Sequence, residues 1–349
     1  MKVSQLLCAA GPVDAVTNQA FAWRRWFERW GWEGRDYAAH MAPGLPARAL
    51  RPMRELEGDH EPDVLVLHYS GYVAGLEQVL GRFPRSLLVS HNVTPARFFW
   101  AHEPVDAARC ELARDQLPAL GALAGAVAGV SRFNARELTE LSGREADVIP
   151  VLFDESRLAA RNGEPQGAPT VLFVGRLTPH KRQDLLIRAL APLREAMPEA
   201  RLVLVGTPLS PPFEERLRAL AGRLAPGAVA FETGGISSER LAGHYRSAHV
   251  FLCLSEHEGF CIPLLEAFHF GLPVIAREAG AVGEVVDDAG ILLGPEDGVD
   301  TVAELLRIVI SDRELRDELR ARGDRRLRGY DQSSTAAGMR EVLETLAVR

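Results

Sequence analysis

Lysine is almost absent from this chain of 349 residues. Of its 40 basic residues only Lys2 and Lys181 are lysine, and the rest are arginine. We attribute the preference for arginine to coding bias. Lys181 stands in a loop that follows a predicted strand, and an ammonium is a compact point charge that a guanidinium does not reproduce. Its retention there indicates a candidate anion-binding loop.

Cysteine is scarce too, and no long apolar run is present. The four cysteines form no C-x-x-C pair and lack the spacing of a zinc site, so we expect buried thiols in a reducing compartment. They are Cys8, Cys110, Cys253 and Cys261. No stretch of about eighteen apolar residues occurs, so we expect no transmembrane helix. The apolar residues 6–10 are too few for a signal peptide and suit a first strand. We therefore expect a cytoplasmic protein.

An excess of positive charge is also missing. The net charge is -7, which argues against nucleic acid as a partner because phosphate binding leaves a basic footprint. The composition, 47% hydrophobic and 25% charged, is ordinary for a globular enzyme. The length suits two domains better than one.

The most informative stretch is residues 255–267, which read SEHEGFCIPLLEA. It follows the apolar residues 250–254, a predicted buried strand, and Pro263 suits the first turn of a helix. Glu258 then lies on the strand-to-helix loop and Glu266 near the helix start, at the edge of a parallel sheet where such folds bind ligands. Either acid alone would mean little, because the helix dipole favours a first-turn glutamate and loops often carry one beside glycine.

A second stretch, residues 175–181, reads GRLTPHK and also follows a predicted strand. Arg176 can bind two phosphate oxygens, Lys181 can act as a point charge, and the helix start that follows favours anions. An ordinary exposed basic loop is the alternative, and the arginine-rich composition makes such loops common. Its occurrence in one domain with Glu258 and Glu266 favours an anion site.

The whole of residues 255–267 resembles the E-x7-E motif of retaining glycosyltransferases of the GT-B fold, family 4. The resemblance covers nearly the whole chain and is most specific in its second half. It implies an α/β fold with two Rossmann-like parallel-sheet domains facing a cleft. It also implies transfer of a hexose from a UDP-sugar or GDP-mannose to an acceptor hydroxyl. Cys261 stands where many members have glycine, and we expect its small side chain to leave the site open.

Roles for individual residues follow from the same resemblance. Glu258 would hold a hydroxyl of the donor sugar, and Glu266 would hold the nucleotide ribose. Arg176 and Lys181 would bind the donor diphosphate, and His91 would face the donor sugar from the first domain. The catalytic residues are thus His91, Arg176, Lys181 and Glu258. Further donor-contacting positions are Gly11, Gly175, Gly234, Gly259, Phe260 and Cys261.

Several of these assignments have structural alternatives. Gly11 in the first strand-to-helix loop could serve loop flexibility only. His68, at the end of a predicted strand, could be a satisfied structural residue or a site residue. Tyr245 matches the family pattern but is read as a packed core aromatic. Residues 89–99, VSHNVTPARFF, look like those of a subgroup that builds polysaccharide and lipopolysaccharide.

Two catalytic features of other glycosyl-transfer enzymes are not found. The acids Asp287, Asp288 and Asp297 have no D-x-D context, so we expect no metal and no cofactor besides the nucleotide sugar. No candidate for a covalent nucleophile is found, although retaining glycosidases use a carboxylate in that role. The family reaction is a front-face attack in which the leaving phosphate takes the acceptor proton. That expectation rests on the resemblance alone.

An aromatic and basic helix is predicted near the amino terminus. Four of the five tryptophans lie between Trp23 and Trp32, interleaved with arginines. Ala20, Trp23, Phe27 and Trp30 share one face at helical spacing, which is most simply packed on the sheet. The alternative is a surface that docks on anionic lipid at the inner face of a membrane.

The strand and helix pattern predicts the domain boundaries. We expect an acceptor domain at residues 1–153, a linker at 154–168 and a donor domain at 169–330. A helix at 331–349 would cross back to the first domain. One charged amphipathic helix is predicted over residues 300–323.

Other functions stay open. Within the fold, a sugar-nucleotide epimerase or a phosphorylase is the alternative, and outside catalysis a scaffold that pairs with an active glycosyltransferase. The acceptor could be a saccharide, a lipid-linked sugar or a small molecule. The oligomeric state is not predicted.

Overall fold

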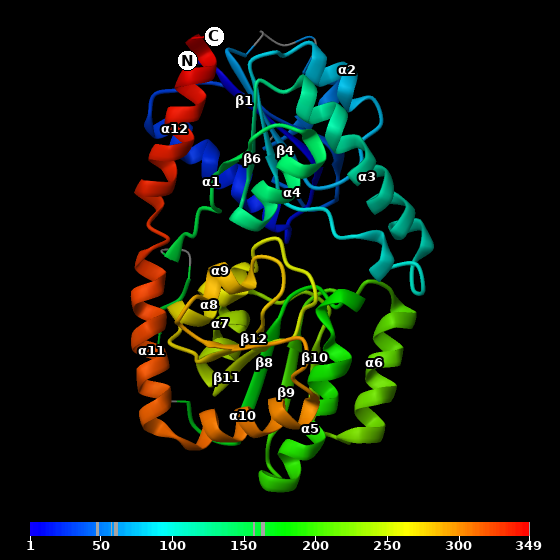
Figure 1. Ribbon diagram of the computed structural model, residues 1–349, viewed down its shortest axis with the longest axis vertical. Helices are drawn as coiled ribbons and strands as arrows, with labels where there is room; N and C mark the ends of the chain where they lie inside the picture. The colour runs from blue at the N-terminus through cyan, green and yellow to red at the C-terminus, as the bar shows by residue number, and fades with distance from the viewer. Residues whose placement is uncertain (47–48, 57, 59–61, 156–157, 162–164, 349) are drawn as a thin grey trace. The chain divides into compact units, whose positions relative to one another are not determined.

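The computed structural model describes residues 1–46, 49–56, 58, 62–155, 158–161 and 165–348. The chain divides into two compact units, of which the first joins Met1–Leu152 to Tyr330–Arg349 and the second is Phe153–Gly329. Each unit contains one parallel β-sheet with helices packed on it (Figure 1). The predicted α/β class with two Rossmann-like domains is therefore confirmed.

The sheet of the first unit has seven strands in the order β3-β2-β1-β4-β5-β6-β7, and every pairing is parallel. The strands are β1 (Val3–Ala10), β2 (Asp36–Met41), β3 (Arg51–Pro52), β4 (Val64–Tyr69), β5 (Ser86–Ser90), β6 (Ala126–Gly129) and β7 (Asp147–Val148). Its helices are α1 (Ala15–Arg29), α2 (Leu76–Gly81), α3 (Pro104–Leu123), α4 (Arg132–Ser142) and α12 (Gln332–Val348). Short 3-10 turns lie at η1 (Met53–Glu55) and η2 (Ala96–Phe98). The direction of the strand order reverses between β1 and β4.

The sheet of the second unit has six strands in the order β10-β9-β8-β11-β12-β13. They are β8 (Thr170–Val174), β9 (Arg201–Val205), β10 (Val229–Glu232), β11 (Val250–Cys253), β12 (Val274–Arg277) and β13 (Ile291–Leu293). The helices are α5 (Gln183–Ala196), α6 (Pro211–Leu224), α7 (Ser238–Ser247), α8 (Ile262–His269), α9 (Val282–Val286), α10 (Val299–Ser311) and α11 (Arg313–Arg328), with a 3-10 turn at η4 (Pro179–Lys181). Here the strand order reverses between β8 and β11, which places the carboxyl ends of these two strands side by side.

Apolar strands pack against the amphipathic faces of their helices in both units. In the second unit Leu172 and Leu252 are fully buried in the sheet, and Leu186 and Leu190 of α5 are 1% exposed. Such continuous apolar runs are typical of parallel strands that are covered on both faces. These cores hold the sheet edges that carry the polar loops described below.

The helix predicted over residues 300–323 is wrong in one respect, because the structure has two helices there. α10 ends at Ser311, and α11 begins at Arg313. Asp312 adopts an extended backbone between them, and its carboxylate accepts the Leu315 amide at 3.0 Å. This N-cap satisfies an amide at the start of the second helix and so favours a break that hydrophobic periodicity alone does not reveal.

The region predicted as a linker at 154–168 is described only in part, because residues 156–157 and 162–164 lie outside the described residues. The described residues contact helices of the second unit. The carbonyl of Ala159 lies 3.1 Å from His269 Nε2, and Arg161 pairs with Asp324 at 2.5 Å. After Gly329 the chain belongs to the first unit again, through α12. None of the helices in the described part of the chain is long and apolar enough to cross a bilayer.

Candidate active site

The reversal of strand order brings two loops of the second unit together. β8 and β11 are neighbours, with Val171 opposite Val250, so residues 175–181 and 254–261 leave the same edge of the sheet. The amide of Glu256 donates to the carbonyl of His180 at 2.7 Å and ties one loop to the other. The carboxyl edge at such a switch point is where open α/β sheets bind ligands.

Lys181 and Glu258 form an ion pair across these two loops. Lys181 Nζ lies 2.5 Å from Glu258 Oε1, and the Ser255 hydroxyl donates to the same oxygen at 2.7 Å. The side chains are only 18% and 6% exposed, respectively. Burial by itself lowers the pKa of Lys181, but the charge and the hydrogen bond of Glu258, together with the nearby thiols of Cys253 and Cys261, raise that pKa above its ordinary value. The site therefore keeps a fixed positive charge beside a carboxylate.

The backbone around Glu258 is held by a tight approach from the loop after β12. The Ala281 amide donates to the Glu258 carbonyl at 2.9 Å. Gly280 has φ of +60°, and a Cβ built there would lie 2.3 Å from that carbonyl oxygen. Only glycine fits both the left-handed backbone and the contact. Gly280 therefore fixes the position of Glu258, a role that the sequence analysis missed.

Arg182 organises a second set of charges next to Lys181. Its backbone is left-handed, with φ of 51°, at the residue before α5. Its guanidinium pairs with Glu256 and donates to Asp184 at 3.0 Å, and Arg277 lies 3.7 Å from Glu256. The ion pair of Arg182 with Glu256 joins the end of the first loop to the second loop. Arg182 could have been found from the sequence because it directly follows Lys181, but the motif at residues 175–181 ends before it.

Glu266 is hydrogen-bonded by the tyrosine predicted to be a core aromatic. Tyr245 is 2% exposed, which confirms its burial, and its hydroxyl donates to Glu266 Oε2 at 2.7 Å. Burial raises the pKa of Glu266, and the hydrogen bond from Tyr245 opposes that rise. Tyr245 therefore orients the carboxylate in addition to packing in the core.

Two thiols lie beside Glu258 and could hold a soft metal ion. Cys253, Glu258 and Cys261 are buried, and one ligand atom of each lies within 4.8 Å of the others. Cys261 has a left-handed backbone, with φ of 74°, where glycine was expected to be common. Thiolates with one carboxylate suit zinc or cadmium. Since Lys181 already occupies the carboxylate, a cation there would compete with Lys181.

The remaining predicted residues of the second unit lie outside the ion pair of Lys181 and Glu258 and its hydrogen bonds. Arg176 is exposed and has no ion pair among the residues that the structure describes. Gly175 has φ of +151°, and its amide donates to the carbonyl of Val205 at 2.9 Å. Gly234 is exposed in the loop after β10, and a Cβ there would meet no atom within 4 Å. Their contacts with a ligand stay predictions.

Gly259 and Phe260 lie in the same loop as Glu258, between β11 and α8. Phe260 is 7% exposed, so its ring is packed, and Gly259 is half-buried. Pro263 lies in the first turn of α8, as predicted.

His91 and Gly11 belong to the first unit. His91 directly follows β5, and its Nε2 lies 2.9 Å from Nδ1 of His68. His68 is fully buried on β4. The Gly11 amide, predicted to approach a ligand, donates to Thr17 Oγ1 at 3.1 Å. The structure thus brings His68 to His91, while the roles of His91 and Gly11 toward a ligand stay predictions.

The aromatic helix α1 packs within the first unit. Trp23 and Phe27 are 2% and 0% exposed, and Trp30 lies 4.7 Å from Trp32 between ring centroids. Arg340 of α12 lies 5.6 Å from the Trp30 ring centroid, a cation–π contact. This arrangement supports packing as the main role of the aromatic face.

Residues 154–326 match the family model described as Glycosyl transferases group 1. The sulfoquinovosyl transferase SQD2 of Arabidopsis thaliana is 31% identical over 199 residues, which are 56% of this chain and 36% of that protein. A GDP-mannose-dependent alpha-(1-6)-phosphatidylinositol monomannoside mannosyltransferase of Mycolicibacterium smegmatis is 33% identical over 258 residues, which are 68% of this chain and 64% of that protein. The chain thus spans less than two thirds of the length of either relative.

Solved structures of low sequence identity share the fold. Anabaena Alr3699/HepE, solved with UDP and glucose, aligns at a TM-score of 0.79 and 17% identity, over 99% of this chain and 100% of that chain. Sucrose-phosphate synthase from Thermosynechococcus elongatus aligns at 0.75 and 20% identity, over 99% and 98%. These alignments show a GT-B fold. Within this fold, residues 154–326 are the part that matches the group 1 glycosyl transferase model.

Proposed function

We propose that this protein is a retaining, metal-independent glycosyltransferase that moves a hexose from a nucleotide-diphosphate sugar to an acceptor hydroxyl. The observation that carries the proposal is the buried pair of Lys181 and Glu258 at the switch point of the second unit. A cation and a carboxylate held at that edge suit the diphosphate and the hydroxyls of one donor molecule. The family match of residues 154–326 supports the same activity.

In this proposal Lys181 and Arg176 stabilise the diphosphate as it leaves. The two residues lie on the loop that leads into α5, whose first amides favour an anion. Fixed charges aimed at the leaving group lower the barrier most when they need no rearrangement. The ion pair with Glu258 and the bonds around Arg182 hold Lys181 in place before the donor binds.

Glu258 binds a hydroxyl of the donor sugar, and Glu266 binds the ribose. A carboxylate accepts hydrogen bonds from hydroxyl groups, and Tyr245 leaves one Glu266 oxygen, Oε1, outside its 2.7 Å contact. Glu258 is already bound by Lys181 and Ser255, which suits recognition better than attack on the anomeric carbon. His91, which belongs to the first unit, is proposed to face the donor sugar.

In the proposed reaction the transfer is a front-face substitution. A bond forms between the acceptor oxygen and the anomeric carbon, while the bond from that carbon to the phosphate oxygen breaks. The acceptor proton moves to the departing phosphate oxygen, so no protein base is needed. The products are a glycoside of unchanged anomeric configuration and a nucleoside diphosphate.

Donor identity can be tested by thermal shift. Nucleotides, UDP-sugars and GDP-mannose are added with and without chelator, and the correct donor should raise the melting temperature by mass action. Relatives named for GDP-mannose and structures solved with UDP-glucose support both classes as candidates. Transfer is then measured with that donor, and nuclear magnetic resonance of the product anomeric proton tests retention. An inverted product would contradict the proposal.

An epimerase or a phosphorylase is the alternative enzyme. An epimerase would isomerise or hydrolyse the donor with no acceptor present, and a phosphorylase would require phosphate. A non-catalytic scaffold is the alternative outside catalysis, and the intact Lys181 and Glu258 pair argues against it. A Lys181→Ala protein with full biological activity would favour the scaffold.

The acceptor is proposed to bind the first unit, and the surrounding pathway to be polysaccharide, lipopolysaccharide or glycoconjugate synthesis. The relative that acts on a phosphatidylinositol monomannoside supports a lipid-linked acceptor. Peripheral contact of α1 with a membrane stays a second proposal. Flotation with anionic liposomes at low salt tests it, and loss of flotation in an Arg25→Ala, Arg29→Ala double variant would attribute the contact to α1.

A further inference from the structure

Five polar side chains form a continuous chain of hydrogen bonds inside the first unit. Three lie on the adjacent strands β2, β1 and β4, one follows β5, and one lies on α1. In order along the bonds they are Arg24, Asp36, Gln5, His68 and His91. We call these five residues the polar chain.

The anchored end of the polar chain is an ion pair. Arg24 donates through Nε to Asp36 Oδ2 at 3.1 Å and through Nη2 to Asp36 Oδ1 at 2.5 Å. Nη2 also donates to the carbonyl of Val3 at 2.9 Å. Asp36 is 6% exposed, so its charge needs this partner. A bidentate guanidinium makes Asp36 an acceptor only.

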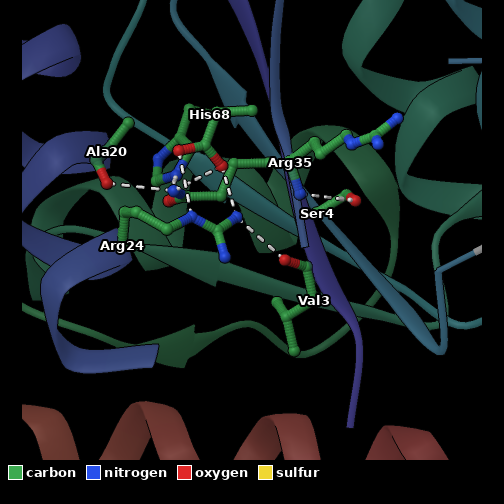
Figure 2. Close-up of polar contacts among 8 residues, drawn as sticks. Val3, Ser4, Ala20, Arg24, Arg35 and His68 are labelled. Carbon is green, nitrogen blue, oxygen red and sulfur yellow. Dashed lines mark hydrogen bonds and ion pairs between the residues drawn. The ribbon is translucent and has the colours of Figure 1, made fainter. Parts of the chain in front are cut away.

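The amide of Gln5 has one allowed orientation. Its nitrogen lies 2.9 Å from the carbonyl of Ala20 and 3.0 Å from Asp36 Oδ1. Both partners can only accept, so the amino group must face them. The amide oxygen of Gln5 therefore points the other way and lies 2.8 Å from His68 Nε2. Figure 2 shows His68, Ala20 and Arg24 grouped around this network.

That orientation sets the protons on both histidines. Since the Gln5 oxygen can only accept, His68 must carry its proton on Nε2. Burial, with a smaller effect of His91, lowers the pKa of His68 well below its usual value, so the ring is neutral and its Nδ1 accepts. His91 Nε2, 2.9 Å away, must then be the donor. Its Nδ1 is left without a proton.

We propose that the polar chain holds His91 in its Nε2–H tautomer, so that His91 presents an unprotonated Nδ1 to the substrate. Gln5 and His68 are positioning residues, and Asp36 with Arg24 gives the chain its direction. The consequence rests on the proposed function. His91 accepts a hydrogen bond from a sugar hydroxyl and does not donate one to a phosphate. His91 therefore favours a sugar with a hydroxyl at this position over a sugar with an anionic group there.

The first test reads the tautomer without any measurement of activity. Protein labelled with 15N-histidine is studied by two-bond proton–nitrogen correlation spectra at pH 7.5, and the His91 signals are assigned by their loss in His91→Gln. We expect neutral Nε2–H rings for His68 and His91. An Nδ1–H ring or a mixture of tautomers at His91 would overturn the proposal. This result does not depend on whether the protein transfers sugar.

Two substitutions of His68 then separate positioning from packing. His68→Asn keeps an acceptor oxygen near the place of Nδ1, whereas His68→Leu removes it. We expect His91 to stay in the Nε2–H form in the first variant and to become mixed in the second. We expect kcat/KM to fall about tenfold in His68→Leu and less in His68→Asn.

Equal losses of kcat/KM in the two folded variants, with the His91 tautomer unchanged in both, would mean that His68 only packs. A wild-type protein with the expected tautomer but no transfer from any donor would refute the proposed function and leave the assignment of the polar chain standing.

Discussion

The Nζ of Lys181 lies 2.5 Å from Oε1 of Glu258, although the two residues are 77 positions apart in the chain. Both side chains are largely buried. Removal of one partner of a buried ion pair leaves the other charge without compensation, which is more costly than loss of an exposed pair. Substitution of either residue should therefore lower both the activity and the free energy of unfolding, and these two effects can be measured separately.

Lys181→Ala should lower kcat/KM for the donor by about 100-fold or more, because a fixed cation at the leaving diphosphate is lost. The rate is measured with saturating acceptor, and circular dichroism checks that the variant is folded. Arg188→Ala, on the exposed side of α5, is the matched control and should keep its activity. A Lys181→Ala protein as fast as the control would contradict the assignment.

Tyr245→Phe should raise the donor KM about fivefold with a smaller change in kcat, since one hydrogen bond that orients Glu266 is lost. The ring itself stays, so the core packing changes little. Tyr72→Phe removes a hydroxyl from a 38% exposed ring of the first unit and serves as control. If Tyr245→Phe changed neither constant, Glu266 would not depend on the tyrosine.

Gly280→Ala should lower the free energy of unfolding by about 2 kcal/mol or more and reduce activity, because the new Cβ would meet the Glu258 carbonyl in a left-handed backbone. Urea denaturation gives the first quantity. Gly222→Ala is the control, since a Cβ there meets no atom within 4 Å within helix α6, and it should stabilise slightly. Similar stabilities of the two variants would refute the tight contact.

Acid should destabilise the protein through His91. Burial lowers the pKa of His91 from 6.5 to about 4. The unfolded chain therefore binds more protons below pH 6.5, and the free energy of unfolding falls as the pH decreases from 6.5 toward 4. The fall should be smaller in His91→Gln, which does not titrate, and unchanged in the exposed control His40→Gln. Identical pH dependence in all three proteins would contradict a His91 that stays neutral in the folded protein.

A chelator should have no effect on transfer, whereas a soft metal should inhibit it. EDTA should leave transfer unchanged, because the proposed leaving-group stabilisation uses Lys181 and Arg176. Cadmium should inhibit through Cys253, Cys261 and Glu258 by competition with Lys181. Cys253→Ser should lose most of that inhibition when each protein is compared with its own uninhibited rate. Activity that EDTA removes and magnesium restores would overturn the metal-independent mechanism.

Much of the fold could be predicted from local patterns. Apolar runs in the sequence predict the strands Thr170–Val174, Arg201–Val205 and Ser86–Ser90 at the bounds that the structure shows. Short apolar runs bounded by Gly, Pro and polar residues carry a strong signal, because both faces of a parallel strand are buried. The helix Gln183–Ala196 can be predicted at its observed bounds too, since its apolar residues recur on one face.

Local patterns fail at one capping contact and at one strand of the first sheet. Asp312 ends one helix and starts the next, although the apolar periodicity continues through it. The strand Asp36–Met41 was not predicted, since its burial declines along its length and its pattern is neither continuous nor strictly alternating. The capping bond of Asp312 decides the first case, and pairing of Asp36–Met41 with β1 and β3 decides the second.

The amino-acid sequence alone identifies the residue types of the candidate site. The two glutamates at their spacing, Pro263 and the isolated Lys181 can be read from the printed sequence because they depend on residues close in the chain. The contact of Lys181 with Glu258, the bond from Tyr245 to Glu266 and the polar chain cannot be read that way. They arise from which strands are neighbours and in what register. Side-chain packing over the whole sheet sets both, and no short stretch of sequence records it.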